Sequence, residues 1–508
     1  MQTTSIWVKE TESKSYPEFE GSKDFDVAIV GGGITGLTAG LLLQRSGKRV
    51  AILDNAQIAM GESGFTTAHL TQILDTRYHK LISDFGVEKA CLAAASHRAA
   101  IDLIEKLSTE YSIDCQFEKV PGYLYSETGD DNADFEKEIN ALAKVNIPAQ
   151  LVESAPLPFS TKQAIRIDTQ AQFSPRKYLL GLADEFTKMG GSIFEHSRVS
   201  DVTDGSPCKV QIENGTISAY DVILSANVPV TNWLFLNTKI AAYRSYALCA
   251  TTQKPVLPGL YWDSLDTYHY IRNYHSDKIG DCLIIGGEDH KTGTTANTDE
   301  CFARLERYAR EHFDITEIEC RWSGQIINPV DGLAYIGLNS MAKHVYVSTG
   351  YSGNGLTYGT LGGMIIADAI SGRENRFAPV YQATRVHAMA SIGKFISENV
   401  DTPVHFIADR LSNNIAQSVD EIKFNEGALL KCNGETLAAY RDENGELHTC
   451  SAVCPHMGCL VQWNAAETSW DCPCHGSRFD KNGKLQNGPA IADLKPCDAV
   501  MDEIPAIA

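Results

Sequence analysis

The segment DFDVAIVGGGITGLTAGLLLQRSGKRVAILD (24–54) decides the fold of the first part of this chain. An apolar run enters a G-x-G-x-x-G turn at Gly31, Gly33 and Gly36; a helix-forming stretch follows, and a second apolar run ends at Asp54. In such a unit the three glycines permit the tight turn, the approach of a pyrophosphate and close helix–strand packing. The helix N-terminus favours phosphate charge, and Asp54 can accept from ribose hydroxyls. The segment predicts a Rossmann-like βαβ unit, with a nicotinamide or a flavin dinucleotide as its ligand; a turn that binds no nucleotide is the alternative.

Two cysteine–histidine boxes near the other end, CPHMGC (454–459) and CPCHGS (472–477), form the second strong signal. They offer Cys454 and His456 from the first box, and Cys472 and His475 from the second. A Rieske [2Fe–2S] centre needs two thiolates on one iron and two imidazoles on the other. Mixed Cys/His sets also suit tetrahedral zinc, although zinc sites more often pair one Cys-x-x-Cys motif with another such pair. The boxes therefore predict an iron–sulfur cluster, with zinc as the alternative.

Composition limits the classes of partner. The chain has 508 residues, enough for two or three domains, and a formal net charge of −20. This charge argues against nucleic acid and against anionic lipid, since both need clustered cations. The first residues lack the pattern of a signal peptide, and the longest apolar stretch (26–43) is interrupted by glycines, so no membrane span is expected. Fourteen cysteines scattered over the chain indicate a reducing, cytoplasmic location.

Three further segments favour FAD through a family resemblance. GESGFTTAHLT (61–71), YDVILSAN (220–227) and VYVSTGYSGNGLTYGTLGGMIIADAI (345–370) resemble segments around the flavin in the D-amino-acid oxidase and glycine oxidase superfamily. In the last segment a helix would point its N–H groups at the flavin, where they stabilise negative charge. The resemblance implies further FAD contacts at Thr66, Thr67, Val199, Gly353, Gly355, Leu356 and Thr357.

Taken together, the chain resembles bacterial FAD-dependent oxidoreductases that carry a C-terminal Rieske domain. This implies an α/β Rossmann-like FAD-binding fold with an α+β substrate domain, followed by an all-β Rieske domain. The expected parts are an N-terminal extension (1–23), an oxidoreductase (24–372), a helical connector (373–415) and the Rieske domain (416–508). Within the oxidoreductase the FAD-binding pieces are about 24–110, 165–235 and 320–372, and the substrate domain about 111–164 and 236–319.

The C-terminal boxes resemble those of the Rieske proteins of cytochrome bc complexes. In those proteins two extra cysteines form a disulfide between the cluster loops, which implies a bond between Cys459 and Cys474, an exception in a reducing compartment. Ser477 can donate a hydrogen bond to a cluster sulfur. Phe479 stands where those proteins have a tyrosine that donates to a ligand sulfur. Since such bonds raise the reduction potential, we expect a potential below that of the bc-complex proteins.

The implied activity is oxidation of an amine-like or related small molecule, with single electrons relayed between FAD and the cluster and exchanged with an external donor or acceptor, which a protein can provide. Glycine oxidase relatives bind the substrate carboxylate with an arginine, but this chain has Ile326 at that place. The candidate substrate residues are therefore Arg272, Tyr268, Tyr270, Gln325 and His290. An electron-transfer protein without a small-molecule substrate is the alternative. A Rieske oxygenase ranks last, because the sequence shows no convincing 2-His-1-carboxylate motif.

Overall fold

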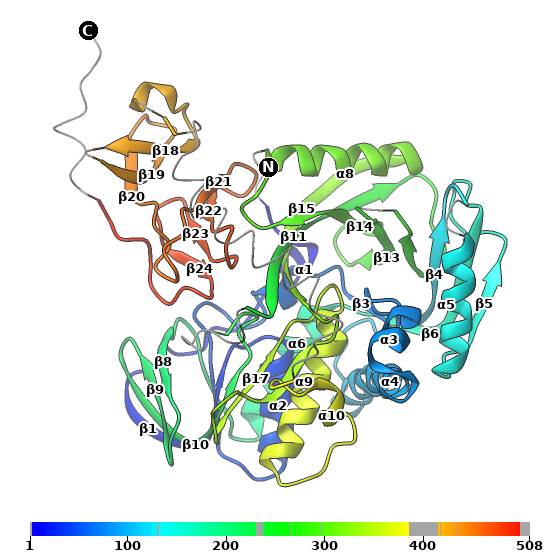
Figure 1. The fold of residues 1–508 in the computed structure, drawn as a ribbon, viewed down its shortest axis with the longest axis horizontal. Helices are drawn as coiled ribbons and strands as arrows, with labels where there is room; N and C mark the ends of the chain where they lie inside the picture. Colours follow the sequence, from blue (N-terminus) through cyan, green and yellow to red (C-terminus); the bar gives the residue numbers. More distant parts are fainter. Residues whose placement is uncertain are drawn as a thin grey trace.

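The computed structural model describes residues 3–129, 132–229, 236, 238–265, 267–295, 297–385, 415–416, 418–432 and 434–497. In these residues the chain forms two large sheets, and two small sheets near its C-terminal end (Figure 1). The expected order of an α/β nucleotide-binding fold, an α+β part and an all-β part is confirmed.

The eight-stranded sheet contains the predicted βαβ unit. Its order is β16–β17–β10–β1–β2–β7, and the β8–β9 hairpin extends from β10. The strands β1, β2, β7, β10 and β17 are parallel. The bounds are Gly21–Val30 (β1), Val50–Leu53 (β2), Ser192–Phe194 (β7), Val199–Thr203 (β8), Cys208–Ile212 (β9), Gly215–Leu224 (β10), Tyr335–Leu338 (β16) and Val345–Thr349 (β17).

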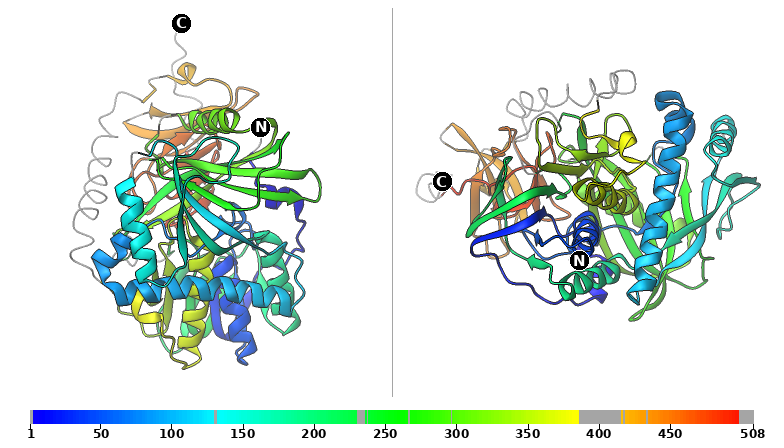
Figure 2. Two further views of the ribbon diagram at one scale, coloured as in Figure 1. Left: turned by 90° about the vertical axis from the view of Figure 1, so that its right-hand side faces the viewer. Right: turned by 90° about the horizontal axis from the view of Figure 1, so that it is seen from below.

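The central strand of this sheet is apolar on both faces, so both faces are covered. Helices cover one face, and the β8–β9 hairpin lies over the other. Val27 and Ile29 of β1 pack into the core shared with the helices, while Ala28 and Val30 point to the core beneath the β8–β9 hairpin. Helix α2 (Ile34–Arg45) packs against α6 (Pro175–Lys188) and α9 (Gly355–Ile370), and α9 packs against the long helix α4 (Val87–Glu110). Figure 2 shows the long helix α4 crossing these helices.

The nine-stranded sheet forms the roof of the nucleotide-binding part. Its order is β15–β11–β14–β13–β12–β4–β6–β3, with β5 paired to β6. Helix α8 (Thr298–His312) packs on β14 and β11. The bounds are His69–Leu70 (β3), Glu118–Ser126 (β4), Ala149–Val152 (β5), Gln163–Gln172 (β6), Ile240–Thr252 (β11), Leu260–Asp263 (β12), Tyr270–Ser276 (β13), Gly280–Lys291 (β14) and Ile315–Pro329 (β15).

The second sheet is larger than expected. Strands β6 and β15, which fall largely in segments expected to belong to the FAD-binding part, pair along β4 and β11 of the second sheet. Helices α3 (Tyr78–Phe85) and α5 (Asn132–Lys144) pack against each other beside it. The physical reason is backbone pairing, since the fifteen residues of β15 run antiparallel beside β11 from Ile240 to Thr252.

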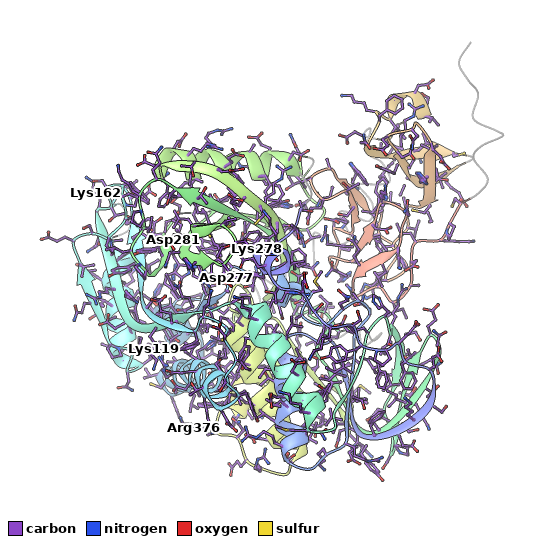
Figure 3. All side chains as sticks on the ribbon, turned by 180° about the vertical axis from the view of Figure 1, so that it is seen from behind. Lys119, Lys162, Asp277, Lys278, Asp281 and Arg376 are labelled. Atoms are coloured by element: carbon purple, nitrogen blue, oxygen red, sulfur yellow. A yellow bond between two sulfur atoms is a disulfide. The ribbon has the colours of Figure 1, made fainter. Side chains whose placement is uncertain are left out.

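The N-terminal residues are part of this body. Helix α1 (Ile6–Glu10) buries Ile6 and Trp7 completely, and the Trp7 indole N–H donates to the Thr66 carbonyl at 2.6 Å. Charged residues occupy the surface instead; Figure 3 labels Lys119, Lys162, Asp277, Lys278, Asp281 and Arg376, all of which are exposed.

The C-terminal part is all-β, as expected. It consists of the sheets β18–β19–β20 and β21–β22–β23–β24. The bounds are Glu426–Cys432 (β18), Glu435–Arg441 (β19), Leu447–Ser451 (β20), Gln462–Asn464 (β21), Ser469–Asp471 (β22), Arg478–Asp480 (β23) and Leu485–Asn487 (β24). Of the expected helical connector, α10 (Ala378–Tyr381) is described, and residues 386–414 lie outside the described residues. In the described residues, no helix combines the length and apolar character needed to cross a membrane.

Candidate functional site

One long cleft of about 640 Å³ runs between the two large sheets, along the carboxyl ends of β1, β2 and β10. Ligands of open α/β sheets bind at this edge. Most of the residues expected to contact FAD line the cleft: Gly31, Gly33, Asp54, Thr66, Thr67, Val199, Gly353, Gly355 and Leu356. The residues expected to contact FAD therefore line one cleft, from the phosphate turn to the start of α9.

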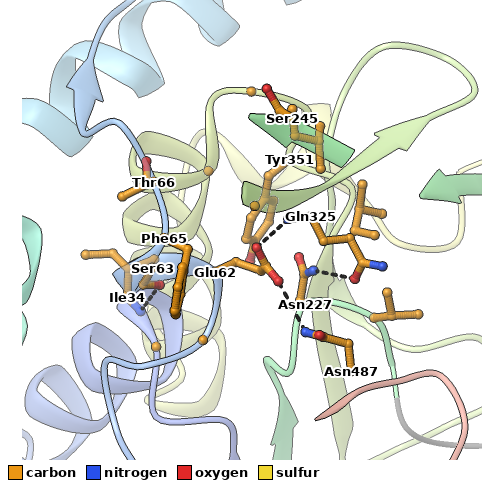
Figure 4. A pocket seen from close by; sticks show the side chains of 18 of the residues that line it. Ile34, Glu62, Ser63, Phe65, Thr66, Asn227, Ser245, Gln325, Tyr351 and Asn487 are labelled. Atoms are coloured by element: carbon orange, nitrogen blue, oxygen red, sulfur yellow. Dashed lines mark hydrogen bonds between the residues drawn. The ribbon is translucent and has the colours of Figure 1, made fainter. Parts of the chain in front are cut away.

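The phosphate turn has the close approaches that its glycines permit. Gly31 has a φ of +107°, and a Cβ there would lie 2.7 Å from the Ser225 carbonyl oxygen. A Cβ on Gly36 would overlap the carbonyl oxygen of Gly31. The backbone N–H of Ile34 donates to the Ser63 hydroxyl at 3.1 Å (Figure 4). Only glycine fits at 31 and 36, so the turn suits a pyrophosphate held on the N-terminus of α2.

Asp54 lies where an acid that binds ribose is expected. Its carboxylate accepts from the backbone N–H groups of Gly32 and Ala56 at 2.8 and 2.9 Å. Burial raises the pKa of Asp54 despite these two bonds. Val199 at the start of β8 lines the same end of the cleft. Together with the turn, these residues fit the adenosine half of FAD.

Thr357 is an exception among the expected FAD contacts. Its side chain is 1% exposed and does not line the cleft. The hydroxyl lies 2.8 Å from Nδ1 of His97 on α4 and donates to the Asn354 carbonyl at 3.2 Å. The side chain therefore joins α9 to α4. Thr357 lies in the first turn of α9, on the side of that helix that faces α4.

Aromatic side chains line the roof of the cleft, where the flavin ring and a substrate are expected. Tyr268, Tyr270 and Trp262 line it, and the Tyr270 hydroxyl lies 2.5 Å from the Ser245 hydroxyl. Tyr268 and Tyr270 were expected here from the sequence. This roof gives a small molecule an apolar surface with a few hydroxyl groups.

A side recess opens from the roof, and its charged residues were not expected from the sequence. Asp75, Asp289, Arg77 and Tyr268 line it. Oδ1 of Asp289 is buried without a hydrogen-bond partner among the described residues, and burial raises the pKa of this carboxyl to about 7. Arg77 precedes α3 and Asp289 lies on β14, so only the fold brings them together. No motif in the sequence could have identified this pair.

Arg272 and His290 do not lie in the cleft, contrary to expectation. The Arg272 guanidinium is 1% exposed, donates to the carbonyls of Ala68 and Phe173 at 2.7 and 3.1 Å, and lies over the ring of Trp7. His290 lies 2.9 Å from the Tyr246 hydroxyl through Nε2 and 2.9 Å from the Lys291 carbonyl through Nδ1. Neither side chain lines the cleft or the recess: Arg272 lies farther along β13 than Tyr270, and His290 stacks on the ring of Tyr246.

Gln325 does line the cleft, but its side chain serves a different contact from the one expected. The Nε2 amide donates to the carbonyl of Gly476 at 2.6 Å, and Oε1 accepts from Asn227 at 3.3 Å. Its backbone N–H donates to the Glu62 carboxylate at 2.5 Å. Burial raises the pKa of Glu62. Gly476 follows His475 directly, so this glutamine joins the cleft to a cluster-binding loop.

The two cysteine–histidine boxes meet as a Rieske centre requires. The rings of His456 and His475 lie 4.8 Å apart, and the neighbouring Cys472 thiol lowers the pKa of Cys454 to about 7. Nδ1 of His475 is buried without a hydrogen-bond partner among the described residues, which suits a ring nitrogen that ligates iron. The residues fit a [2Fe–2S] cluster.

The other residues named around the boxes lie beside the expected cluster ligands. Cys459 and Cys474 form the expected disulfide between the two loops. The Ser477 hydroxyl interacts with the Cys454 thiol and accepts from the Ala490 backbone N–H at 3.0 Å. Phe479 is fully buried in the same core as Cys454 and Cys472.

Comparison with known proteins agrees with this geometry. Residues 26–369 match the family described as FAD dependent oxidoreductase, and residues 413–498 match the Rieske [2Fe-2S] domain, which excludes the zinc alternative. The chain is 31% identical to the Rieske 2Fe-2S iron-sulfur protein YhfW of Bacillus subtilis, over 97% of both chains. It is 23% identical to gamma-glutamylputrescine oxidoreductase of Escherichia coli, over 69% of this chain and 85% of that protein.

Among solved structures, the chain resembles glycine oxidase from Geobacillus kaustophilus, with a TM-score of 0.62 and 22% identity, over 72% of this chain and 99% of the other. This similarity concerns the fold. The chain belongs to the family of FAD-dependent oxidoreductases and carries a C-terminal Rieske [2Fe-2S] domain.

Proposed function

We propose that this oxidoreductase oxidises a small amine-like molecule in the cleft and relays single electrons between FAD and the Rieske cluster. When bound, FAD would take up two electrons from the substrate and could release them one at a time, and a [2Fe–2S] cluster carries one at a time. A chain that holds both groups can therefore convert a two-electron oxidation into two one-electron steps. An external protein or small carrier would complete the cycle at the cluster.

The contact between Gln325 and Gly476 is the observation that carries the relay. It brings the loop that holds Cys472 and His475 to the edge of the flavin cleft through one 2.6 Å hydrogen bond. Electron transfer within the chain needs the two groups close together, and this loop lies against the cleft without a domain movement.

The recess supports a small-molecule substrate over a purely electron-transferring role. Its carboxylates, Asp75 and Asp289, suit the ammonium group of an amine, and Tyr268 lies beside both. Arg77 offers a cation for a second polar group of the same molecule. The names of two similar proteins, a gamma-glutamylputrescine oxidoreductase and a glycine oxidase, point to nitrogen compounds for those proteins and support the same class here.

We also propose that the protein works in the cytoplasm. Every cysteine outside the Cys459–Cys474 pair is an unbridged thiol in the structure, which fits a reducing compartment. The one disulfide lies between the cluster loops, where both sulfurs are nearly inaccessible to external thiols.

Anaerobic reduction by a panel of amines and amino acids tests the proposal, with absorption recorded at the flavin and cluster bands. We expect one group of amines to bleach the flavin band, with reduction of the cluster following. Bleaching of the flavin alone would contradict the relay. If no compound in the panel bleaches the flavin while a reduced protein carrier does, the electron-transfer role without a substrate is correct.

A further inference from the structure

We propose that the FAD site is composite: the Rieske domain forms one wall of the cleft, so that FAD binding and docking of the Rieske domain stabilise each other. This inference rests on the FAD site and is independent of the substrate and of electron relay. It assigns FAD-binding residues to a part of the chain whose sequence motifs concern only the cluster.

The segment 485–491 supplies the wall. Leu485, Gln486, Asn487, Gly488, Ala490 and Ile491 all line the cleft. They lie on the same cleft as Asp54 and Val199 at the adenosine end and Gly31 at the phosphate turn. The Asn487 amide donates to Glu62 at 3.2 Å, and Figure 4 shows it beside Asn227 inside the cleft. An FAD molecule that fills the cleft would therefore touch both domains.

The backbones approach closely at two points, which fixes the docked position. A Cβ on Gly476 would overlap Ala242 on β11 and lie 2.8 Å from Nε2 of Gln325. A Cβ on Gly293 would lie 2.8 Å from the backbone nitrogen of Pro473. Both contacts involve the second cluster loop, so the loop that holds Cys472 and His475 is the part pressed against the oxidoreductase.

Buried charges cross the same boundary. Arg244 on β11 donates to both carboxylate oxygens of Glu467 at 2.7 and 2.8 Å, and these side chains are only 2% and 10% exposed. Arg478 also contacts Glu467, at 3.1 Å. Burial disfavours the charged form of Glu467, but the two arginines outweigh it and lower its pKa to about 2. Because separation would leave Arg244 without this carboxylate, docking has a defined geometry.

A third contact lies away from the cleft and makes the inference testable. The Thr298 hydroxyl, at the start of α8, donates to Asn464 at 2.7 Å and accepts from the Ala466 backbone N–H at 3.1 Å. Thr298 is 4% exposed and lines neither the cleft nor the recess. Any effect of this residue on FAD must therefore pass through docking of the Rieske domain.

Hydrogen exchange of the full chain, with and without FAD, is the first test. Linkage requires that a ligand held by both domains protects their contacts throughout the interface. We expect FAD to slow exchange of backbone amides in 464–466, which do not line the cleft, by at least tenfold. Equal exchange rates at 464–466 in the two states would overturn the inference.

Thr298→Arg, which inserts a long charged side chain into the contact, is the second test, with the FAD dissociation constant read from flavin fluorescence. We expect at least tenfold weaker FAD binding, while the electron paramagnetic resonance spectrum shows an intact cluster.

Thr316→Arg is the matched control, since the Thr316 hydroxyl bonds Thr251 at 2.7 Å on the exposed far end of β15. Unchanged FAD affinity in Thr298→Arg would overturn the inference. If that variant does not fold, Thr298→Val, which removes both hydrogen bonds of the hydroxyl, replaces it with the same readout. Neither readout requires a substrate, so failure of the proposed relay leaves both tests intact.

Discussion

Arg272 shows how much the burial of a single side chain decides. A guanidinium on a strand near the flavin has the right chemistry for a substrate carboxylate, and the strand was expected from the sequence. In the structure the group donates to the backbone carbonyls of Ala68 and Phe173 and contacts the rings of Trp7 and Tyr274. Arg272 lies two residues along β13 from Tyr270, on the same face of the strand. At that point the backbone at Ala68 and Phe173 covers it, so burial and not the face of the strand decides its role.

We predict that Arg272→Met destabilises the protein by about 2–4 kcal/mol, because it leaves buried carbonyls without a donor. Urea unfolding of the holoprotein measures this. Arg166→Met is the control, since Arg166 is a half-exposed residue on β6 that pairs with Asp168. Wild-type stability of Arg272→Met, together with a need for more substrate to reduce the flavin, would restore the role in substrate binding.

Asp289 makes stability depend on pH in a predictable direction. Burial raises its pKa from 3.8 to about 7, so the folded state holds a proton that the unfolded state releases near pH 4. The resulting stabilisation is complete below about pH 4 and is lost as pH rises to about 7.

We expect Asp289→Asn to be more stable than the wild type above pH 7, and this advantage to shrink toward pH 4. Asp314→Asn, at an exposed carboxylate paired with Lys254, serves as control. An advantage of Asp289→Asn that does not change with pH would contradict the assignment.

Phe479 is fully buried beside the cluster cysteines and offers no hydrogen-bond donor. Phe479→Tyr adds a hydroxyl at that position, and one hydrogen bond to a ligand sulfur is worth about 1.4 kcal/mol, or about 60 mV for a one-electron couple. We expect redox titration to show a potential raised by about this amount, with no change in Phe424→Tyr on the exposed surface. A potential that stays the same or falls in Phe479→Tyr would show that the hydroxyl does not reach a sulfur.

At the scale of elements, the βαβ unit and the cluster loops were predictable because short local motifs define them. The partners of β6 and β15 were not, since pairing between strands far apart in sequence leaves no local signal. Strand β15 alternates between buried and less buried residues over much of its length, which predicts a strand but not the neighbour beside it. Helix α1 was missed for a related reason: its five residues form a helix through the contacts of Ile6 and Trp7 with the core.

Gly36→Ala tests the local part of the fold. A Cβ at this position overlaps the Gly31 carbonyl oxygen, so the start of α2 must move away from β1. We expect at least a hundredfold loss of FAD affinity, measured by flavin fluorescence. The control is Gly40→Ala in the same helix, where the Cβ meets side-chain atoms and no backbone, at 2.9 Å from Ile52 and 3.4 Å from Phe186. FAD affinity that falls equally in both variants would show that the helix, rather than the phosphate turn, is responsible.

At the scale of the whole molecule, the motifs predict both cofactor sites but not how they meet. Gln325 and Gly476 are separated by 151 residues in sequence, and Arg244 and Glu467 by 223. Such pairs form only when the folded domains dock. The composition of the chain and the spacing of its motifs do not predict that docking. The docked Rieske domain turns two separate cofactor sites into neighbours within one chain.

The most direct test of this account is the rate of cluster reduction after the flavin alone has been reduced by a light pulse under anaerobic conditions. The docked structure predicts first-order transfer to the cluster, at a rate that does not depend on protein concentration. Gln325→Leu, which removes the amide that donates to Gly476, should slow this transfer. A cluster that stays oxidised, or a rate proportional to protein concentration, would contradict the account.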